Sequence, residues 1–371
     1  MITPRRDPEI LLRRYWDDPD TPVVTAGLSA LSAGYRAALG LRDRAYRWRV
    51  FRTGRLDVPV ISVGNITLGG SGKTPLVEEV VRCLRELGAA PAVVSRGYGR
   101  RTRGVHVVAD REGVKLGPRA AGDEPLLLAG RLPGTPVVVG ESRFEAARTA
   151  VLSCGATAIV LDDGFQHRSL AKDLEVVAVN GRAPWGNGRL FPRGMLREPL
   201  SALRRADLVA VTNPPGPADV REVAAVLRRQ GATAPVLVGT YEVVEAREAR
   251  TEVRAAVADL AGRRFLAFAG LGSPRGFGDT LGAVGVDVAG LVEYPDHHWF
   301  TDQDVAELER QARAVGAEGV ITTEKDWVRL GGLGDPAVPL WVLAVRLRLD
   351  AGRELLTGAL SRVLAGAAAQ R

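Results

Sequence analysis

The sequence has little cysteine and no long apolar run. Cys83 and Cys154 are its only cysteines in 371 residues, so we expect no disulfide framework and a reducing, cytoplasmic setting. The longest runs without a charged residue have fifteen residues, as in Thr21–Tyr35. Because a helix that crosses a bilayer needs roughly 18 or more apolar residues, the sequence predicts no membrane-spanning segment. The charged N-terminus, which carries no short apolar core, predicts no signal peptide.

Lysine and histidine are also scarce. Only four of the 50 lysine and arginine residues are lysine, and the chain has four histidines. An arginine inside a motif is therefore weak evidence of a functional role, whereas a lysine or a histidine there is less easily explained by chance. The lysines are Lys73, Lys115, Lys172 and Lys325, and the histidines are His106, His167, His297 and His298.

One segment has almost no acidic residues. The chain carries a net charge of +7, but the stretch from Arg36 to Arg55 holds seven arginines and a single acid, Asp43. Such a stretch can be a solvated helix face, a nucleic-acid surface or a surface for anionic membranes. Apolar residues recur at helical spacing over about 24–51, which predicts a helix. The apolar and aromatic residues of this segment include Leu28, Leu31, Tyr35, Leu39, Tyr46, Trp48 and Phe51.

This combination favours a membrane interface over nucleic acid. For nucleic acid we would expect basic residues and aromatics spread over a sheet or a repeat. A single basic helix with aromatics beside it instead suits anionic headgroups and the boundary of the bilayer. Segment 1–55 is therefore predicted to be a basic amphipathic helical segment on an anionic membrane surface. We expect no nucleic-acid partner, and we expect a monomer.

The rest of the chain alternates strand-like and helical patterns. Its length suits two domains, and its 46% apolar and 25% charged residues are ordinary for a globular protein. The alternation predicts an α/β protein with a mostly parallel sheet and helices on both faces. A polar stretch from Tyr241 to Arg254 interrupts it. We therefore expect a P-loop domain over 56–240, a linker over 241–256 and a smaller α/β domain over 257–371 that contributes to the active site.

The stretch "LGGSGKTP", Leu68–Pro75, lies between an apolar strand and a helical pattern. Strand, glycine loop, Gly-Lys-Thr and helix is the order of a P-loop. Glycines let backbone N–H groups converge on phosphate oxygens at the positive end of the helix. The lysine would reach the β- and γ-phosphates, and the threonine hydroxyl would bind Mg²⁺. The predicted ATP-binding residues are Thr67, which stands where the usual pattern has glycine, Leu68, Gly69, Gly70, Ser71, Gly72, Lys73 and Thr74.

A second motif, "AIVLDDGFQH", supplies the acids of such a site. Asp162 and Asp163 follow an apolar strand, where a Mg²⁺-binding carboxylate belongs in P-loop proteins. A plain solvated turn is the alternative. We expect one acid to bind the metal directly and the other to lie behind it, with Thr74 as a further metal ligand. No Asn-Lys-x-Asp element for guanine occurs in the sequence, so ATP with Mg²⁺ is predicted.

Eight motifs in order resemble a known family. They are "SVGNITLGGSGKTP", "SRGYGR", "GDEPLLLA", "VVVGESRFEAA", "LDDGFQH", "GNGRLFPRGMLREP", "PDHHWF" and "TTEKD". Together they resemble tetraacyldisaccharide 4'-kinase, the membrane-associated kinase that phosphorylates the lipid A precursor, from about Leu28 to the C-terminus. The resemblance implies transfer of the γ-phosphate of ATP to the 4'-hydroxyl of a tetraacyl glucosamine disaccharide 1-phosphate, which forms lipid IVA. It also implies a peripheral protein on the cytoplasmic face of the inner membrane.

The resemblance assigns roles by position. It makes Asp123 of "GDEP" the catalytic base and pairs it with His297 of "PDHHWF", with His298 as the alternative. A carboxylate is also what a poor nucleophile such as a sugar hydroxyl requires, although Asp123 could instead be a helix N-cap and "PDHHWF" a turn with buried aromatics. The resemblance places further residues near the substrate or the reaction centre: Glu124, Arg143, Gln166, His167, Asn187 and Glu198.

A P-loop ATPase or switch protein that acts on a protein partner is the alternative function. Such a protein needs a glutamine or a similar group that orients water, together with a switch region. Neither is identifiable in the sequence, which therefore favours the kinase.

Overall fold

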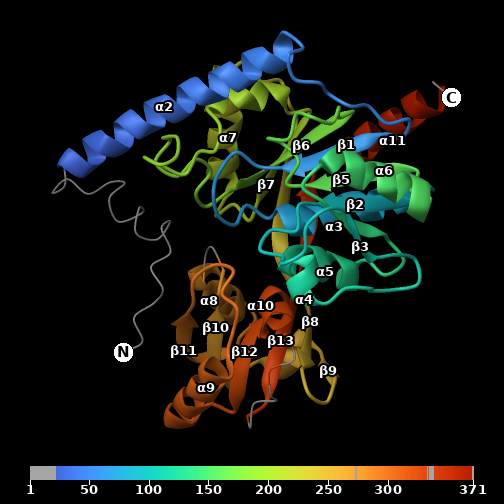
Figure 1. Ribbon diagram of the computed structural model, residues 1–371. Helices are drawn as coiled ribbons and strands as arrows, with labels where there is room; N and C mark the ends of the chain where they lie inside the picture. The colour runs from blue at the N-terminus through green and yellow to red at the C-terminus, as the bar shows by residue number, and fades with distance from the viewer. Residues whose placement is uncertain (1–21, 272–273, 332, 334–337, 370–371) are drawn as a thin grey trace.

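The computed structural model describes residues 22–271, 274–331, 333 and 338–369. Figure 1 shows two lobes, one above the other, with the long helix α2 lying across the top of the first lobe. Residues 1–21 of the predicted N-terminal segment lie outside the described residues. An α/β fold with a mostly parallel sheet is confirmed.

In the described part of the chain, thirteen strands form one continuous sheet. The order is β11-β10-β12-β13-β8-β7-β6-β1-β5-β2-β4-β3, and β9 pairs with β8 outside this path. The strands are β1 (Val60–Gly64), β2 (Pro91–Ser95), β3 (His106–Ala109), β4 (Val137–Val139), β5 (Ala158–Asp162), β6 (Leu174–Asn180), β7 (Leu208–Thr212), β8 (Val236–Glu248), β9 (Arg254–Ala255), β10 (Arg264–Ala269), β11 (Asp287–Glu293), β12 (Gly319–Thr323) and β13 (Leu340–Ala351).

The helices cover both faces of this sheet. Alternating strand residues separate the faces, since Ile61 packs with α3, α5 and α11, whereas Val60 packs with α6. The α-helices are α2 (Pro22–Arg47), α3 (Lys73–Glu86), α4 (Pro118–Ala121), α5 (Asp123–Arg131), α6 (Arg143–Cys154), α7 (Pro217–Arg229), α8 (Pro274–Ala283), α9 (Asp302–Ala314), α10 (Glu324–Leu330) and α11 (Arg353–Ala369), and the 3-10 helices are η1 (Leu200–Arg205) and η2 (Val257–Leu260).

Two antiparallel strands join the lobes. Residues 236–239 of β8 pair with β7 in the first lobe, and residues 340–343 of β13 pair with β12 in the second lobe. Between these ends, residues 240–245 and 344–348 pair only with each other; we call this part the ribbon. The first lobe is residues 22–239 and 349–369, and the second is the described residues between 246 and 343. The stretch expected as a linker over 241–256 instead contains residues 241–248 of the long strand β8. Tyr241 packs against the core of the first lobe and Val243 against that of the second.

The C-terminal helix belongs to the first lobe, unlike the expected domain over 257–371. Leu356 and Leu360 of α11 are buried in the same core as Leu76 of α3. Arg353 donates to Glu79 at 3.0 Å and to Glu86 at 2.9 Å, both on α3. An apolar helical pattern does not reveal which sheet it will cover, and here the return of β13 carries the chain back to the helix of the glycine loop.

Helix α2 confirms the helix expected over about 24–51, although it ends at Arg47. Leu28, Tyr35 and Leu39 of this helix face the first lobe. Tyr35 donates its hydroxyl to the carbonyl of Arg197 at 2.9 Å, while Leu31 is 63% exposed. The helix is therefore fixed to the protein by one face and leaves apolar side chains on another.

Candidate active site

The glycine loop connects β1 to α3. Its backbone turns at Gly69 and Gly72, which have φ of 88° and 77°, and a Cβ on Gly72 would collide with Tyr241 and Thr212. Thr67, in contrast, forms a bridge with Leu196 in extended backbone, which explains why no glycine is needed there. Lys73 is the first residue of α3. The N–H groups of the loop and the positive end of the helix thus meet at one place, as phosphate binding requires.

A buried asparagine holds this loop in shape. The Nδ2 atom of Asn65 lies 2.7 Å from both the carbonyl oxygen of Thr67 and Oγ of Ser71. Gln166, one of the predicted reaction-centre residues, donates to the carbonyl of Asn65 at 2.7 Å. Gln166 therefore supports the entry to the loop from the acid-bearing motif that follows β5.

The two predicted metal acids lie at the end of β5, beside the loop. Asp162 is buried, and Ser95 of β2 donates to its Oδ2 at 2.9 Å. Its Oδ1 is buried without a hydrogen-bond partner in the described structure. Burial, together with the charges of Glu124 and Asp163, raises the pKa of Asp162. A cation would remove this penalty, so the residue fits a metal-binding role.

Asp163 has a different environment. It adopts a positive φ of 55°, and Nη1 of Arg197 donates to both of its oxygens at 3.0 and 2.9 Å. Nζ of Lys73 lies 3.7 Å from its Oδ1. Burial alone would raise the pKa of Asp163, but Lys73 and Arg197 lower it to about 2. Asp163 is thus an ionised carboxylate already held by two cations.

The described residues contain no cluster of three or more His, Cys, Asp or Glu side chains that could hold a metal by themselves. Mg²⁺ usually binds through one or two carboxylates together with substrate phosphates and water. The unpartnered Oδ1 of Asp162 and the hydroxyl of Thr74, half-buried at the start of α3, meet that pattern. The site therefore fits Mg²⁺ bound together with a nucleotide.

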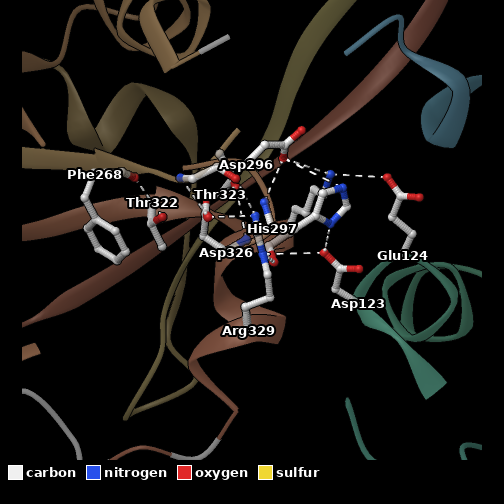
Figure 2. A network of polar contacts seen from close by, with 11 residues as sticks. Asp123, Glu124, Phe268, Asp296, His297, Thr322, Thr323, Asp326 and Arg329 are labelled. Atoms are coloured by element: carbon white, nitrogen blue, oxygen red, sulfur yellow. Dashed lines mark hydrogen bonds and ion pairs between the residues drawn. The ribbon is translucent and has the colours of Figure 1, made fainter. Parts of the chain in front are cut away.

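Asp123 and His297 meet at the junction of the two lobes. Nδ1 of His297 lies 2.8 Å from Oδ2 of Asp123, and Nε of Arg329 lies 3.6 Å from the same oxygen. Figure 2 shows both contacts on one oxygen of Asp123, while no contact is drawn to the other. Burial would raise the pKa of Asp123, but His297, Lys325 and Arg329 lower it to about 2. The carboxylate is therefore ionised and has one oxygen anchored.

Asp123 is not an N-cap. Gly122 occupies that position, with φ of 91°, and Asp123 is the first residue of α5. Of the two adjacent histidines, His297 contacts Asp123, whereas His298 pairs with Asp304 at 3.0 Å and stacks on Tyr294. The geometry thus selects His297 as the partner of Asp123.

Three further predicted residues lie around these groups. Glu124 pairs with Nζ of Lys325 at 3.2 Å. Arg143 is buried, donates to the carbonyl of Gly140 and leaves Nε without a partner in the described structure. Burial lowers the pKa of Arg143 to about 10. The ring of His167 contacts Ser169 at 2.7 Å, and burial next to cations lowers its pKa to about 4, so it is neutral at pH 7.

Asn187 and Glu198 make contacts elsewhere in the first lobe. Asn187 donates to the carbonyl of Arg193, and Glu198 is buried between Arg42 of α2 and Arg205. Within the described chain, neither forms a hydrogen bond with the glycine loop or with Asp123. A role in substrate binding stays a prediction for both.

Sequence reasoning missed three residues at this site, Arg197, Lys325 and Arg329. Lys325 lies in the "TTEKD" motif and is one of four lysines, so its rarity was a usable signal. The arginines gave no such signal in a chain this rich in arginine.

A nucleotide loop beside a carboxylate–histidine pair is the arrangement of a P-loop phosphotransferase, in which an acceptor hydroxyl loses its proton as it receives the phosphoryl group. The family model for Tetraacyldisaccharide-1-P 4'-kinase matches residues 24–364. The chain therefore belongs to the tetraacyldisaccharide 4'-kinase family, the ATP-dependent kinases of lipid A biosynthesis, and the alternative of a switch protein is not favoured.

Individual relatives agree with this assignment. The tetraacyldisaccharide 4'-kinase of Syntrophus aciditrophicus is 40% identical over 353 residues, which cover 91% of this chain and 94% of the relative. That of Anaeromyxobacter dehalogenans strain 2CP-C is 43% identical over 365 residues, covering 94% and 93%. The crystal structure of LpxK from Aquifex aeolicus in complex with ATP is 28% identical, covers 92% of this chain and 99% of that chain, and has a TM-score of 0.72.

Proposed function

We propose that this chain transfers the γ-phosphate of ATP to the 4'-hydroxyl of a tetraacyl disaccharide 1-phosphate, with Asp123 as the proton acceptor. The contact between Asp123 and His297 carries this proposal. The pair joins the two lobes, and Glu124, which follows Asp123, lies close enough to affect the ionisation of Asp162. The carboxylate thus lies next to the place where the phosphates would bind.

The residues of the first lobe hold the nucleotide. Lys73 and the N–H groups of the glycine loop would hold the phosphates, and Thr74 and Asp162 would hold Mg²⁺. Asp163 already pairs with Arg197 and Lys73, so Asp162 would be the acid that binds Mg²⁺ directly. Bound Mg²⁺ supplies positive charge against the phosphate oxygens.

The proton leaves through Asp123. Its Oδ2 is held by His297 and approached by Arg329, so Oδ1 is the oxygen that accepts the proton of the sugar hydroxyl. As the O–H bond breaks, a bond forms between the sugar oxygen and the γ-phosphorus. The bond from that phosphorus to the bridging oxygen breaks, and ADP leaves. His297 fixes the direction of the carboxylate from the second lobe.

ATP turnover with and without the lipid disaccharide tests this function. Without the disaccharide, a kinase should release little ADP, because water is not positioned as the acceptor. Addition of the disaccharide should raise the rate of ADP release and yield one phosphorylated lipid per ADP. Equal ADP release in both conditions, measured with a coupled assay, would instead indicate an ATPase.

We also propose that α2 and the turn after it attach the protein to the anionic, cytoplasmic face of the inner membrane. The exposed apolar side chains include Leu41 (65%), Trp48 (68%) and Phe51 (50%), and exposed arginines lie among them. No described helix is long and apolar enough to cross a membrane. A basic segment with apolar side chains suits attachment by headgroup charge and shallow insertion.

Vesicle sedimentation tests this attachment. The protein should bind vesicles that contain anionic lipid more strongly than neutral ones, and high salt should weaken binding because it screens exposed charges. Replacing the four exposed arginines Arg44, Arg47, Arg49 and Arg52 by glutamine should release it. The matched control replaces four exposed arginines elsewhere: Arg221, Arg228, Arg229 and Arg313. Equal binding to neutral and anionic vesicles would remove the role of charge.

A further inference from the structure

One lysine of the second lobe has no role in the reaction described so far. Lys325 lies on α10, inside the "TTEKD" motif. Its Nζ lies 3.2 Å from Oε1 of Glu124 and 3.6 Å from Oδ1 of Asp296. Its side chain is only 20% exposed. A largely buried ammonium between two carboxylates is held firmly, because each partner would be left with an uncompensated charge without it.

The two partners are the chain neighbours of the reacting pair. Glu124 follows Asp123 on α5, and Asp296 precedes His297 in the second lobe. Asp296 also accepts the backbone N–H of His297 at 3.0 Å. His297 has a positive φ of 58°, a backbone conformation that a histidine adopts only where its surroundings hold it. The ammonium group of Lys325 therefore contacts the carboxylates of the residues next to Asp123 and next to His297, and Figure 2 shows Glu124 and Asp296 beside that pair.

We propose that Lys325 is a positioning residue for phosphoryl transfer, which aligns Asp123 and His297 across the two lobes by holding Glu124 and Asp296 together. This inference rests on the roles proposed above for Asp123 and His297. Without the lysine, two carboxylates from different lobes would face each other, and their repulsion would separate the two residues that must meet.

The rest of α10 supports this arrangement. Arg329, one turn further on, is fully buried and approaches Oδ2 of Asp123. At the start of the helix, Glu324 pairs with Arg131 of α5, and Arg131 also donates to Glu78 of α3 at 2.7 Å. Charge pairs thus run along the whole contact between α10 and α5. The part at Lys325 is the one that reaches both sides of the dyad.

Lys325→Met should lower kcat by about 10- to 100-fold, the scale of a small misplacement of reacting groups. The KM for ATP should change little, because Lys73 and the glycine loop are untouched. Lys325→Arg should recover part of the loss, since it keeps the charge but not the compact shape. The matched control is Lys115→Met, which removes an exposed lysine from a comparable pair of acids, Asp110 at 3.2 Å and Glu112 at 3.0 Å, and should keep normal activity.

Two double variants separate positioning from a loss of stability. In a His297→Ala background, Lys325→Met should lower kcat little further, because the Asp123–His297 contact that Lys325 aligns is already lost. Adding Glu124→Gln to Lys325→Met should restore part of kcat, since it removes one of the repelling charges. If the losses of Lys325→Met and His297→Ala simply multiply, or if Lys325→Met keeps normal kcat, the inference is wrong.

The wild-type protein distinguishes this inference from the proposed function. A wild-type chain that does not phosphorylate the disaccharide overturns the function itself. An active wild type with an equally active Lys325→Met variant overturns only the role of Lys325. If Lys325→Met strongly lowers the thermal unfolding temperature, kcat is compared between the Glu124→Gln variant and the Lys325→Met/Glu124→Gln double variant at a temperature where both are folded.

Discussion

Lys73→Ala is expected to lower kcat on the order of 10³-fold, the scale on which a preorganised charge stabilises a transition state. Lys73 begins α3 directly after the left-handed Gly72, and its Nζ lies near Asp163. It is thus the cation that would lie against the β- and γ-phosphates as charge redistributes between them. The measurement is phosphorylated disaccharide per unit time at saturating ATP, with Lys115→Ala as the control.

Lys73→Arg should lower kcat almost as much as Lys73→Ala. The loop leaves little room, since Tyr241 and Thr212 lie against Gly72, and a planar guanidinium does not replace a compact ammonium there. Near-normal turnover by Lys73→Arg would show that the glycine loop does not bind the phosphates in the way proposed.

Asp123→Asn should lower kcat by about 10²-fold or more, the usual scale of general base catalysis. Asparagine keeps the size and polarity of the side chain but cannot accept the proton of the sugar hydroxyl. Asp123 lies on α5 rather than in the glycine loop, so affinity for ATP should change little. Steady-state kinetics with both substrates varied, together with ATP titration of the variant, measure the two effects separately.

His297→Ala should lower kcat in the same direction, because Asp123 loses the group that holds its Oδ2. The double variant should lose less than the product of the two single losses, since the pair acts as one unit. His298→Ala is the natural control, because His298 contacts Asp304 instead. Fully multiplicative losses, or an Asp123→Asn protein with weak ATP binding and normal kcat, would leave Asp123 with a structural role.

The sequence predicted those parts of the molecule that depend on local order. A strand, a glycine loop and a helix that follow directly along the chain specify the phosphate site, and the apolar run before Asp162 places that acid at the end of the neighbouring strand. The pairing of Asp123 with His297, 174 residues apart, came from family resemblance. Nothing in local periodicity brings those two residues together.

What the sequence did not predict depends on contacts between distant elements. The helical pattern of α11 gave no indication that it covers α3. The charged residues Glu242 and Glu245 made β8 resemble a linker, although Tyr241 and Val243 beside them pack against the cores of the two lobes. Arg197 could not be recognised as the partner of Asp163, since its charge is matched by many other arginines in the chain. The choice between His297 and His298 depends on the positive φ of His297, which the neighbouring residues in the sequence do not predict.

The ribbon has a consequence for how this chain is assembled. The polypeptide leaves the first lobe along β8 and returns along β13, and Gly239 is directly paired with Leu349. A short hairpin turn at the far end of the ribbon, where Glu245 pairs with Ala344, would be enough to reconnect the first lobe, so the second lobe is an insertion within a continuous nucleotide-binding unit. The core of that unit is already closed by α11. The inserted cassette carries His297 and Lys325, and a version of the chain without it would keep the means to bind a nucleotide while lacking the residues that align the proton acceptor.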